Sequence, residues 1–204
     1  MKVLVVGDSF AADWSVKHKN SVGWPNLLAK DFDVTNLAQA GVSEYKIYRQ
    51  VLSVDTCQFD LVLIAHTSPY RVVTRKHPIH CGDPLHDQSD LISGDVAFHA
   101  SRVRNWLTPG IQSANAYFKH HFDIEYHETI YKLLRKSVEE SVAAARKIVI
   151  DNFRFDFKIE KSGDCMDLCD IRDQHPGLFN HLSTQGNEIA YARVLATIRN
   201  CVSN

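Results

Sequence analysis

Residues 2–10 read Lys-Val-Leu-Val-Val-Gly-Asp-Ser-Phe, and this stretch decides the fold class. Residues 2–6 form a short apolar run rich in valine, as expected of a strand that is buried on both faces. Gly7 ends that run. A strand of this kind favours a parallel sheet with helices on both sides.

Further segments along the chain repeat the pattern of strand and helix. Additional strands are predicted at 33–38, 60–65 and 147–152, and helices at 24–32, 43–54, 125–146 and 183–202. The alternation predicts a three-layer α/β/α, flavodoxin-like parallel sheet of about five strands. We expect one domain over 1–204, with residues 153–178 irregular.

Residues 72–122 interrupt this pattern with a long insertion. The segment contains proline, glycine and six of the eleven histidines. We expect short helices and loops there, forming a wall or lid over a site.

The composition argues against several classes of partner. The 204 residues are 45% apolar and 23% charged, with a net charge of −1 and scattered basic residues. A nucleic-acid footprint needs a basic face, so we expect none. No stretch approaches the roughly 20 apolar residues of a membrane span, and no signal segment is visible. Five cysteines without a framework pattern favour reduced thiols and a cytoplasmic location. The sequence does not fix the oligomeric state.

Ser9 is the first candidate catalytic residue, because it directly follows the first strand. Sites in parallel sheets lie beyond the carboxyl ends of the strands. A serine on that turn can raise its hydroxyl above the sheet, near free backbone N–H groups that suit an oxyanion. A helix-capping role is the alternative for Ser9.

His181 is the best candidate base, because a serine hydroxyl needs one. It stands in Asn180-His181-Leu182-Ser183, just before the closing helix. A surface or capping role is the alternative. Asn180, beside it, is a candidate for substrate contact or support.

Several ordered blocks resemble those of the SGNH (GDSL-like) hydrolases, from residue 2 to the last helix. Gly7-Asp8-Ser9-Phe10 resembles block I, which supplies the nucleophile, and 36–41, Asn-Leu-Ala-Gln-Ala-Gly, is similar to block II. The resemblance implies that the N–H groups of Ser9 and Gly41 form the oxyanion hole. His181-Leu182-Ser183, followed by Gly186, resembles block V and implies that His181 is the base.

Block III departs from the family pattern. In place of G-x-N-D, residues 67–71 read Thr-Ser-Pro-Tyr-Arg. This is similar to a T-S-P-x-R form of a subgroup, many of whose members come from phages and environmental bacteria. The usual amide donor to the oxyanion is missing. The Thr67 or Ser68 hydroxyl, or Arg71, is a candidate replacement.

The acid of the triad is also displaced. The family places an aspartate three residues before the histidine, where this chain has Leu178. Asp173 is the nearest upstream acid, and it precedes His175-Pro176, a second local match to the block V ending. Asp173 with His181, Asp173 with His175, and a bare Ser–His dyad all stay open, with His181 preferred as base.

The resemblance implies a serine hydrolase acting on carboxylic esters with short acyl groups such as acetyl, including esters of carbohydrates, without a cofactor. Acyl transfer on the same scaffold and an inactive binding module are the alternatives. His77, His80, Cys81 and His86 cluster in sequence, but their spacing matches no zinc pattern and nearby prolines indicate a loop. We therefore expect no metal site.

Overall fold

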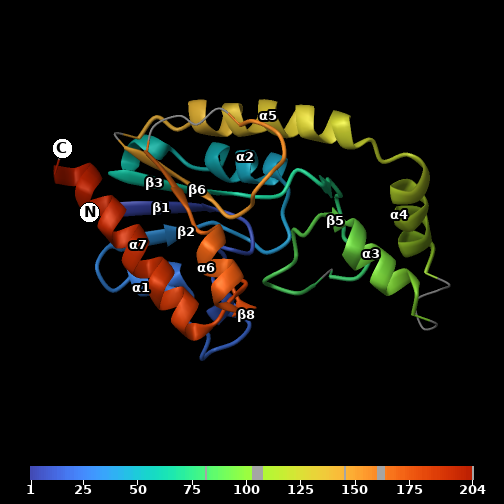
Figure 1. Ribbon diagram of the computed structural model, residues 1–204, viewed down its shortest axis with the longest axis horizontal. Helices are drawn as coiled ribbons and strands as arrows, with labels where there is room; N and C mark the ends of the chain where they lie inside the picture. The colour runs from blue at the N-terminus through green and yellow to red at the C-terminus, as the bar shows by residue number, and fades with distance from the viewer. Residues whose placement is uncertain (81, 103–107, 145, 160–163, 204) are drawn as a thin grey trace.

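The computed structural model describes residues 1–80, 82–102, 108–144, 146–159 and 164–203 (Figure 1). Its strands are β1 (Lys2–Gly7), β2 (Asp33–Asn36), β3 (Leu61–His66), β4 (Arg71–Val72), β5 (Leu91–Ile92), β6 (Lys147–Asp151), β7 (Asp164–Asp167) and β8 (Pro176–Phe179). Its α-helices are α1 (Trp24–Leu28), α2 (Glu44–Leu52), α3 (Ser93–Ala100), α4 (Pro109–His120), α5 (Ile124–Glu140), α6 (Cys169–Gln174) and α7 (Thr184–Ser203). Two 3₁₀ turns lie at Trp14–Val16 and Thr56–Gln58.

Five strands form a parallel sheet in the order β2-β1-β3-β6-β7. The predicted α/β class with about five parallel strands is confirmed. The chain builds outward from β1 in both directions, so the strand order reverses between β1 and β3. In such sheets ligands bind outside the carboxyl ends of the strands at this reversal. Gly7, the last residue of β1, pairs there with Ala65 of β3.

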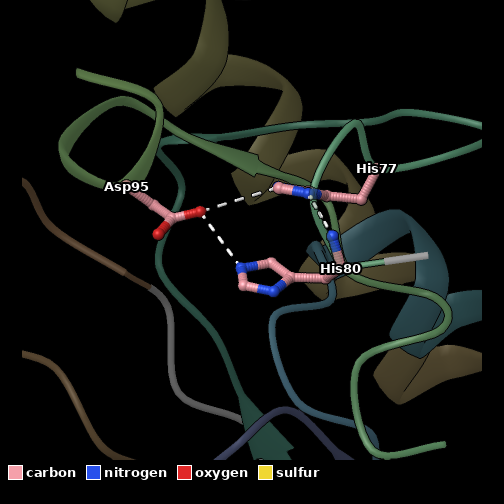
Figure 2. A group of neighbouring side chains, drawn as sticks. All are labelled: His77, His80 and Asp95. Atoms are coloured by element: carbon pink, nitrogen blue, oxygen red, sulfur yellow. Dashed lines mark hydrogen bonds and ion pairs between the residues drawn. The ribbon is translucent and has the colours of Figure 1, made fainter. Parts of the chain in front are cut away.

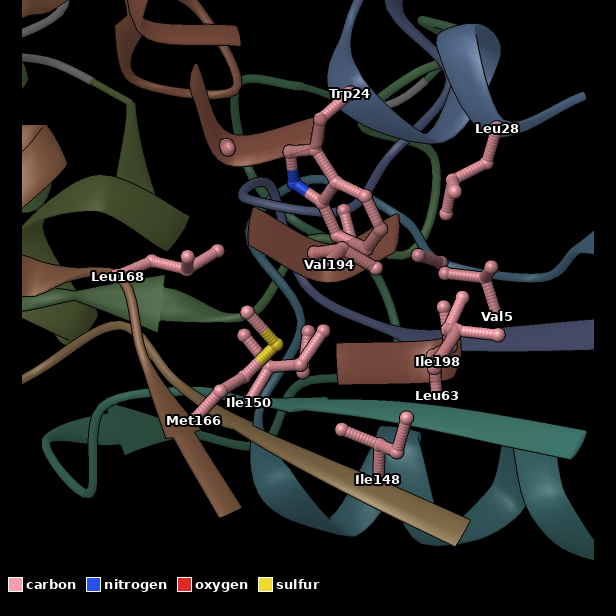
Figure 3. Close-up of a cluster of buried hydrophobic side chains, with 14 of the residues drawn as sticks. Val5, Trp24, Leu28, Leu63, Ile148, Ile150, Met166, Leu168, Val194 and Ile198 are labelled. Atoms are coloured by element: carbon pink, nitrogen blue, oxygen red, sulfur yellow. The ribbon is translucent and has the colours of Figure 1, made fainter. Parts of the chain in front are cut away.

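The two faces of the sheet are covered by different helices (Figure 1). Because side chains alternate along a strand, Val3 and Val5 face one layer while Leu4 and Val6 face the other. The first layer packs on α1 and α7, as Figure 3 shows for its labelled residues: Val5, Trp24, Leu28, Leu63, Ile148, Ile150, Met166, Leu168, Val194 and Ile198. The second packs on α2 and α5 through Ile47, Val51 and Val138. Burial of the strands on both faces explains their continuous apolar sequence.

The structure differs from the expected elements at several points. The segment expected to be irregular, 153–178, holds the edge strand β7 and helix α6. Helix α5 ends at Glu140 rather than near residue 146. Its buried residues include Tyr131, Arg135 and Val138, while Leu133 is 59% exposed.

The insertion at 72–122 contains α3 and α4, in keeping with the short helices expected there. Both helices lie beyond the end of the sheet, at the right of Figure 1. Part of the insertion contacts the loop that precedes α2, because Ala40 N donates to Leu85 O at 3.2 Å and Asp90 N donates to Gly41 O at 2.9 Å. The insertion therefore supports the loop that carries Gly41.

Among the helices that the structure describes, none is both long and apolar enough to cross a bilayer.

Candidate active site

Ser9 lies on a tight turn that follows β1. The Asp8 Oδ1 atom accepts a hydrogen bond from Phe10 N at 3.0 Å, and Ala11 N donates to Asp8 O at 3.0 Å. A buried side chain that the sequence analysis missed, Gln50 of α2, holds the end of the strand: it accepts from Gly7 N at 2.8 Å and donates to Gly7 O at 3.1 Å. The backbone below Ser9 is thus fixed from two sides.

Gly7 is required by the close approach of β3. A Cβ atom at this position would lie 2.7 Å from both the Cβ and the carbonyl oxygen of Ala65. The backbone φ of 156° is also a value that other residues rarely adopt. The glycine of the Gly-Asp-Ser motif therefore lets the strand end tightly against its neighbour.

The structure brings Ser9 and His181 together. Ser9 Oγ lies 2.7 Å from His181 Nε2, although 172 residues separate them. A hydroxyl that donates to Nε2 leaves the ring's proton on Nδ1, which is the tautomer a general base needs. The predicted nucleophile and base thus have the geometry of a Ser–His pair, and His175 does not take that place.

The backbone at His181 is held in an unusual conformation. Asn180 and His181 have φ values of 51° and 59°, in the left-handed region that non-glycine residues seldom occupy. The Phe10 ring stacks on the imidazole, with centroids 4.3 Å apart and planes 28° apart. Strained residues of this kind cluster at functional sites, where the surrounding structure over-determines them.

Asn180 supplies that surrounding structure. Its side chain is fully buried, and its amide nitrogen donates to the carbonyl oxygens of Ser9, Phe10 and Ala12 at 3.3, 3.1 and 2.9 Å. This one side chain therefore joins the histidine loop to the serine turn. Two roles were expected for Asn180, substrate contact and support of the site, and these hydrogen bonds fit the second.

Asp173 lies apart from the pair. One of its oxygens accepts from Arg172 Nη2 at 2.7 Å, the other lies 3.7 Å from Arg154 Nη1, and the side chain is 46% exposed. Within the described part of the chain, no carboxylate hydrogen-bonds to the His181 ring. The expected Asp173–His181 contact is absent because Asp173, on the last turn of α6, pairs with Arg172 and Arg154 instead. Among the described residues, Ser9 and His181 are therefore paired without an acid on the ring.

The electrostatic surroundings of His181 favour the neutral ring. Neighbouring protein atoms desolvate the imidazole, although the residue as a whole is exposed, and this desolvation lowers its pKa below the ordinary 6.5. The Asp8 carboxylate opposes the shift, while the positive charges of Arg71 and Arg172 add to it. Imidazole is therefore unprotonated at neutral pH and able to accept the serine proton.

The Thr-Ser-Pro-Tyr-Arg segment at 67–71 hydrogen-bonds to Asp8, the residue before Ser9. Thr67 Oγ1 donates to Asp8 Oδ2 at 2.7 Å, and Arg71 Nη2 donates to the same oxygen at 2.8 Å. Arg71 Nη1 also donates to Val42 O at 2.8 Å. Asp8 is fully buried, so its charge needs these partners.

This engagement corrects the expectation for Thr67 as the replacement oxyanion donor, whereas the same expectation for Ser68 and Arg71 stays a prediction. The Thr67 hydroxyl is 0% exposed and its proton is used on Asp8, so it is not free for an oxyanion. Ser68 Oγ accepts a long hydrogen bond of 3.4 Å from Tyr70 N. Sequence reasoning missed the pairing with Asp8 because it joins residues about 60 positions apart.

Gly41 has a left-handed backbone conformation and lies tightly against Ser89. Its φ is 79°, and a Cβ atom there would lie 2.4 Å from Ser89 Oγ. In the part of the chain that the structure describes, neither the Ser9 nor the Gly41 backbone N–H has a hydrogen-bond partner. Both N–H groups are therefore free to donate to a ligand.

A cavity of about 260 Å³ lies beyond Ser68, between α2, the β3–β4 loop, α4 and α5. Arg71 lines this cavity and also donates a hydrogen bond to Asp8. Ser9 and His181 are not among its lining residues. The cavity is thus next to the serine turn rather than around it.

A second polar cluster lies at the carboxyl end of β3. His66 Nδ1 lies 2.7 Å from Glu44 Oε1, and its Nε2 lies 3.4 Å from Glu139 Oε1. Arg135 contacts both Glu139, at 3.2 Å, and Asp151, at 2.7 Å. The sequence analysis did not single out these residues, since only the fold brings them together. Burial opposes protonation of His66, but the two glutamates outweigh it and raise its pKa.

Comparisons with known proteins give little beyond this geometry. No family model and no curated protein matches the sequence. Among solved structures, one of a protein assigned to the G-D-S-L family of lipolytic proteins, from Desulfitobacterium hafniense DCB-2, is similar at 11% sequence identity. The alignment covers 96% of this chain and 98% of that chain, with a TM-score of 0.48. At this level, function has to be argued from this chain's own residues.

Proposed function

We propose that this chain is a serine ester hydrolase of the SGNH type, with Ser9 as nucleophile and His181 as general base. The observation that carries the proposal is the 2.7 Å contact between Ser9 Oγ and His181 Nε2. It lies where the strand order reverses, on a sheet whose ends are the usual place for a site. The block resemblances at residues 7–10, 36–41 and 181–183 point to the same chemistry.

The proposed reaction follows from this geometry. Ser9 Oγ attacks the ester carbonyl carbon as its proton passes to His181 Nε2. The N–H groups of Ser9 and Gly41 stabilise the oxyanion. The protonated His181 then gives its proton to the leaving alcohol, and an acyl-serine remains. Water, deprotonated by the same ring, releases the acid and restores Ser9.

The site supports this chemistry with a dyad instead of a triad. Stacking on Phe10 orients the imidazole, and the left-handed backbone of Asn180 and His181 fixes its position. Asp8, gripped by Thr67 and Arg71, holds the serine turn. We assign Asp173 and His175 no part in the reaction. Substrates with short acyl groups, including acetyl esters of carbohydrates, are our proposal from the family resemblance alone.

Hydrolysis of p-nitrophenyl acetate, butyrate and octanoate at pH 8 tests the proposal. We expect turnover by the native chain and background rates for Ser9→Ala and His181→Ala. The trend with acyl length then measures the space available to the acyl group. An added sugar acceptor that diverts the acyl group from water would assign acyl transfer instead. Equal inertness of all three chains would contradict the proposal and favour a binding module.

A further inference from the structure

A group of metal-ligand side chains lies in the insertion, away from the Ser9–His181 pair. His77 and His80 come from the turn after β4, and Asp95 comes from the first turn of α3. One ligand atom from each of the three lies within 4.8 Å of the others. Figure 2 shows both imidazoles directed at the same carboxylate. Two elements that are distant in sequence thus present nitrogen and oxygen ligands to one point.

The separations of the two imidazoles from the carboxylate are close to those between ligands around zinc. His80 Nε2 lies 3.2 Å from Asp95 Oδ2, and His77 Nε2 lies 3.7 Å from the same oxygen. A tetrahedral zinc ion with bonds of about 2.0–2.2 Å separates its ligands by about 3.3–3.5 Å. His99, one turn further along α3, lies 3.4 Å from the other Asp95 oxygen and is outside this group of three.

His77 gives the second, independent observation. Its side chain is 1% exposed, and its Nε2 atom has no hydrogen-bond partner among the described residues. A buried polar atom without a partner costs about 1–3 kcal/mol, so such atoms call for an explanation. This one is directed at the shared carboxylate.

We propose that His77, His80 and Asp95 bind a divalent transition-metal ion of the zinc type. Two imidazoles and one carboxylate form a ligand set that suits such an ion better than magnesium or calcium. His80 and Asp95 are each about 30% exposed, which leaves an entry path. The sequence analysis set His77 and His80 aside because their spacing matches no zinc pattern, and Asp95, which completes the group, comes from α3. Cys81, which falls in the same sequence cluster, lies outside the described residues.

Binding has a structural cost at His77. Its Nδ1 accepts hydrogen bonds from the backbone N–H groups of Ile79 and His80, each at 3.2 Å. A metal on Nε2 requires the ring's proton to move to Nδ1, so both hydrogen bonds must lengthen. We therefore expect weaker binding than in a site whose histidines already donate through the other ring nitrogen. We also expect the amide NMR signals of Ile79 and His80 to shift on binding.

The metal would join the turn after β4 to α3. Residues 85–90 lie between these two elements and contact the loop at Ala40 and Gly41. The ion is thus placed to hold the part of the insertion that supports that loop. This role is structural, and the site is independent of the proposed hydrolase activity.

Zinc titration of the purified full chain, followed by calorimetry or by competition with a fluorescent chelator, tests the proposal. We expect one zinc ion per chain and no competition from millimolar magnesium. Asp95→Asn and His80→Ala should each weaken binding at least about tenfold, while both variants keep the far-UV circular dichroism of the native chain. These two residues are partly exposed, so they are safer to change than the buried His77.

The matched control is His120→Ala, which removes an exposed histidine of α4 beside His121. It should leave the zinc affinity unchanged. Native-like affinity in Asp95→Asn, or loss of binding in His120→Ala, would place the ion on surface histidines and overturn the proposal. Absence of zinc binding by the native chain would overturn it as well. Esterase activity is not used as a readout, so this test and that of the hydrolase proposal fail separately.

Discussion

Two histidines lie near the carboxyl ends of the central strands, and their surroundings are opposite. His66 is buried between Glu44 and Glu139, which raise its pKa. His181 is paired with a serine and has no carboxylate on its ring among the described residues, and burial lowers its pKa. The two glutamates thus contact His66, the histidine that we expect to be structural. The histidine that we propose as a base is left neutral.

The comparison separates what each histidine should do when it is changed. The His66 cluster should contribute to the free energy of unfolding and to activity only through the fold. The Ser9–His181 pair should contribute to turnover and little to stability. Variants at these positions test either the structural role of His66 or the catalytic role of the Ser9–His181 pair.

Loss of the dyad should have the largest effect. Ser9→Ala and His181→Ala each remove the nucleophile or its base, and we expect kcat for p-nitrophenyl acetate to fall by about 10³–10⁶-fold. The double variant should be no slower than either single one, because the two residues act as a unit. Steady-state kinetics measure this, with chemical denaturation as the control for folding. Additive losses in the double variant would contradict the pairing.

Loss of His66 should chiefly affect stability. His66→Ala leaves the buried Glu44 carboxylate without its closest partner. Removing one partner of a buried pair typically costs about 3–5 kcal/mol in the free energy of unfolding. Urea denaturation measures it, and His121→Ala, at an exposed position, should change stability by less than about 0.5 kcal/mol. An equally small change in the stability of His66→Ala would contradict the structural role of His66.

Thr67→Val tests the role given to the Thr-Ser-Pro-Tyr-Arg segment. Valine keeps the shape and removes the hydroxyl that donates to Asp8. We expect a loss of about 1–3 kcal/mol in stability and a fall in kcat of tenfold or less. An oxyanion donor would instead cost about 10²–10³-fold in kcat with little change in stability. The ratio of the two effects decides between the roles.

The midpoints of the pH profiles of activity and of stability should lie on opposite sides of pH 6.5. The lowered pKa of His181 means that kcat/KM should rise with pH and reach half its plateau below 6.5. For His66 the folded-state pKa is raised, so its contribution to stability is complete below 6.5 and is lost as pH rises through the folded pKa. Rate and urea-denaturation profiles of the native chain measure both. The loss of stability at high pH should be absent in the His66→Ala variant.

Asp173→Asn should have the smallest effect. Asp173 is held by Arg172 and Arg154 on the surface. We expect kcat to change by less than about threefold, since exposed ion pairs contribute little. A fall of 10²-fold or more would show that Asp173 orients the base during turnover, and the dyad description would be wrong.

The sequence predicted the residues that follow strands better than the contacts between distant loops. Ser9 directly follows a buried apolar strand, and His181 directly precedes a clear helix, so both were found. The edge strand β7 was missed because Asp164–Asp167 is short and only partly buried, which gives no apolar run. The grip of Thr67 and Arg71 on Asp8 depends on strand order, which the sequence expresses only indirectly. Asp173 was proposed from proximity in sequence, and α6 places it elsewhere.

The most direct test of the account is labelling of the native chain with a fluorophosphonate probe, which captures a serine activated by a base. The serine oxygen displaces fluoride from phosphorus, and peptide mass spectrometry then identifies the modified residue. We predict one label per chain, on Ser9, that persists in Asp173→Asn and is lost in His181→Ala. A label on another residue, or an unlabelled Ser9 in the folded native chain, would contradict the account.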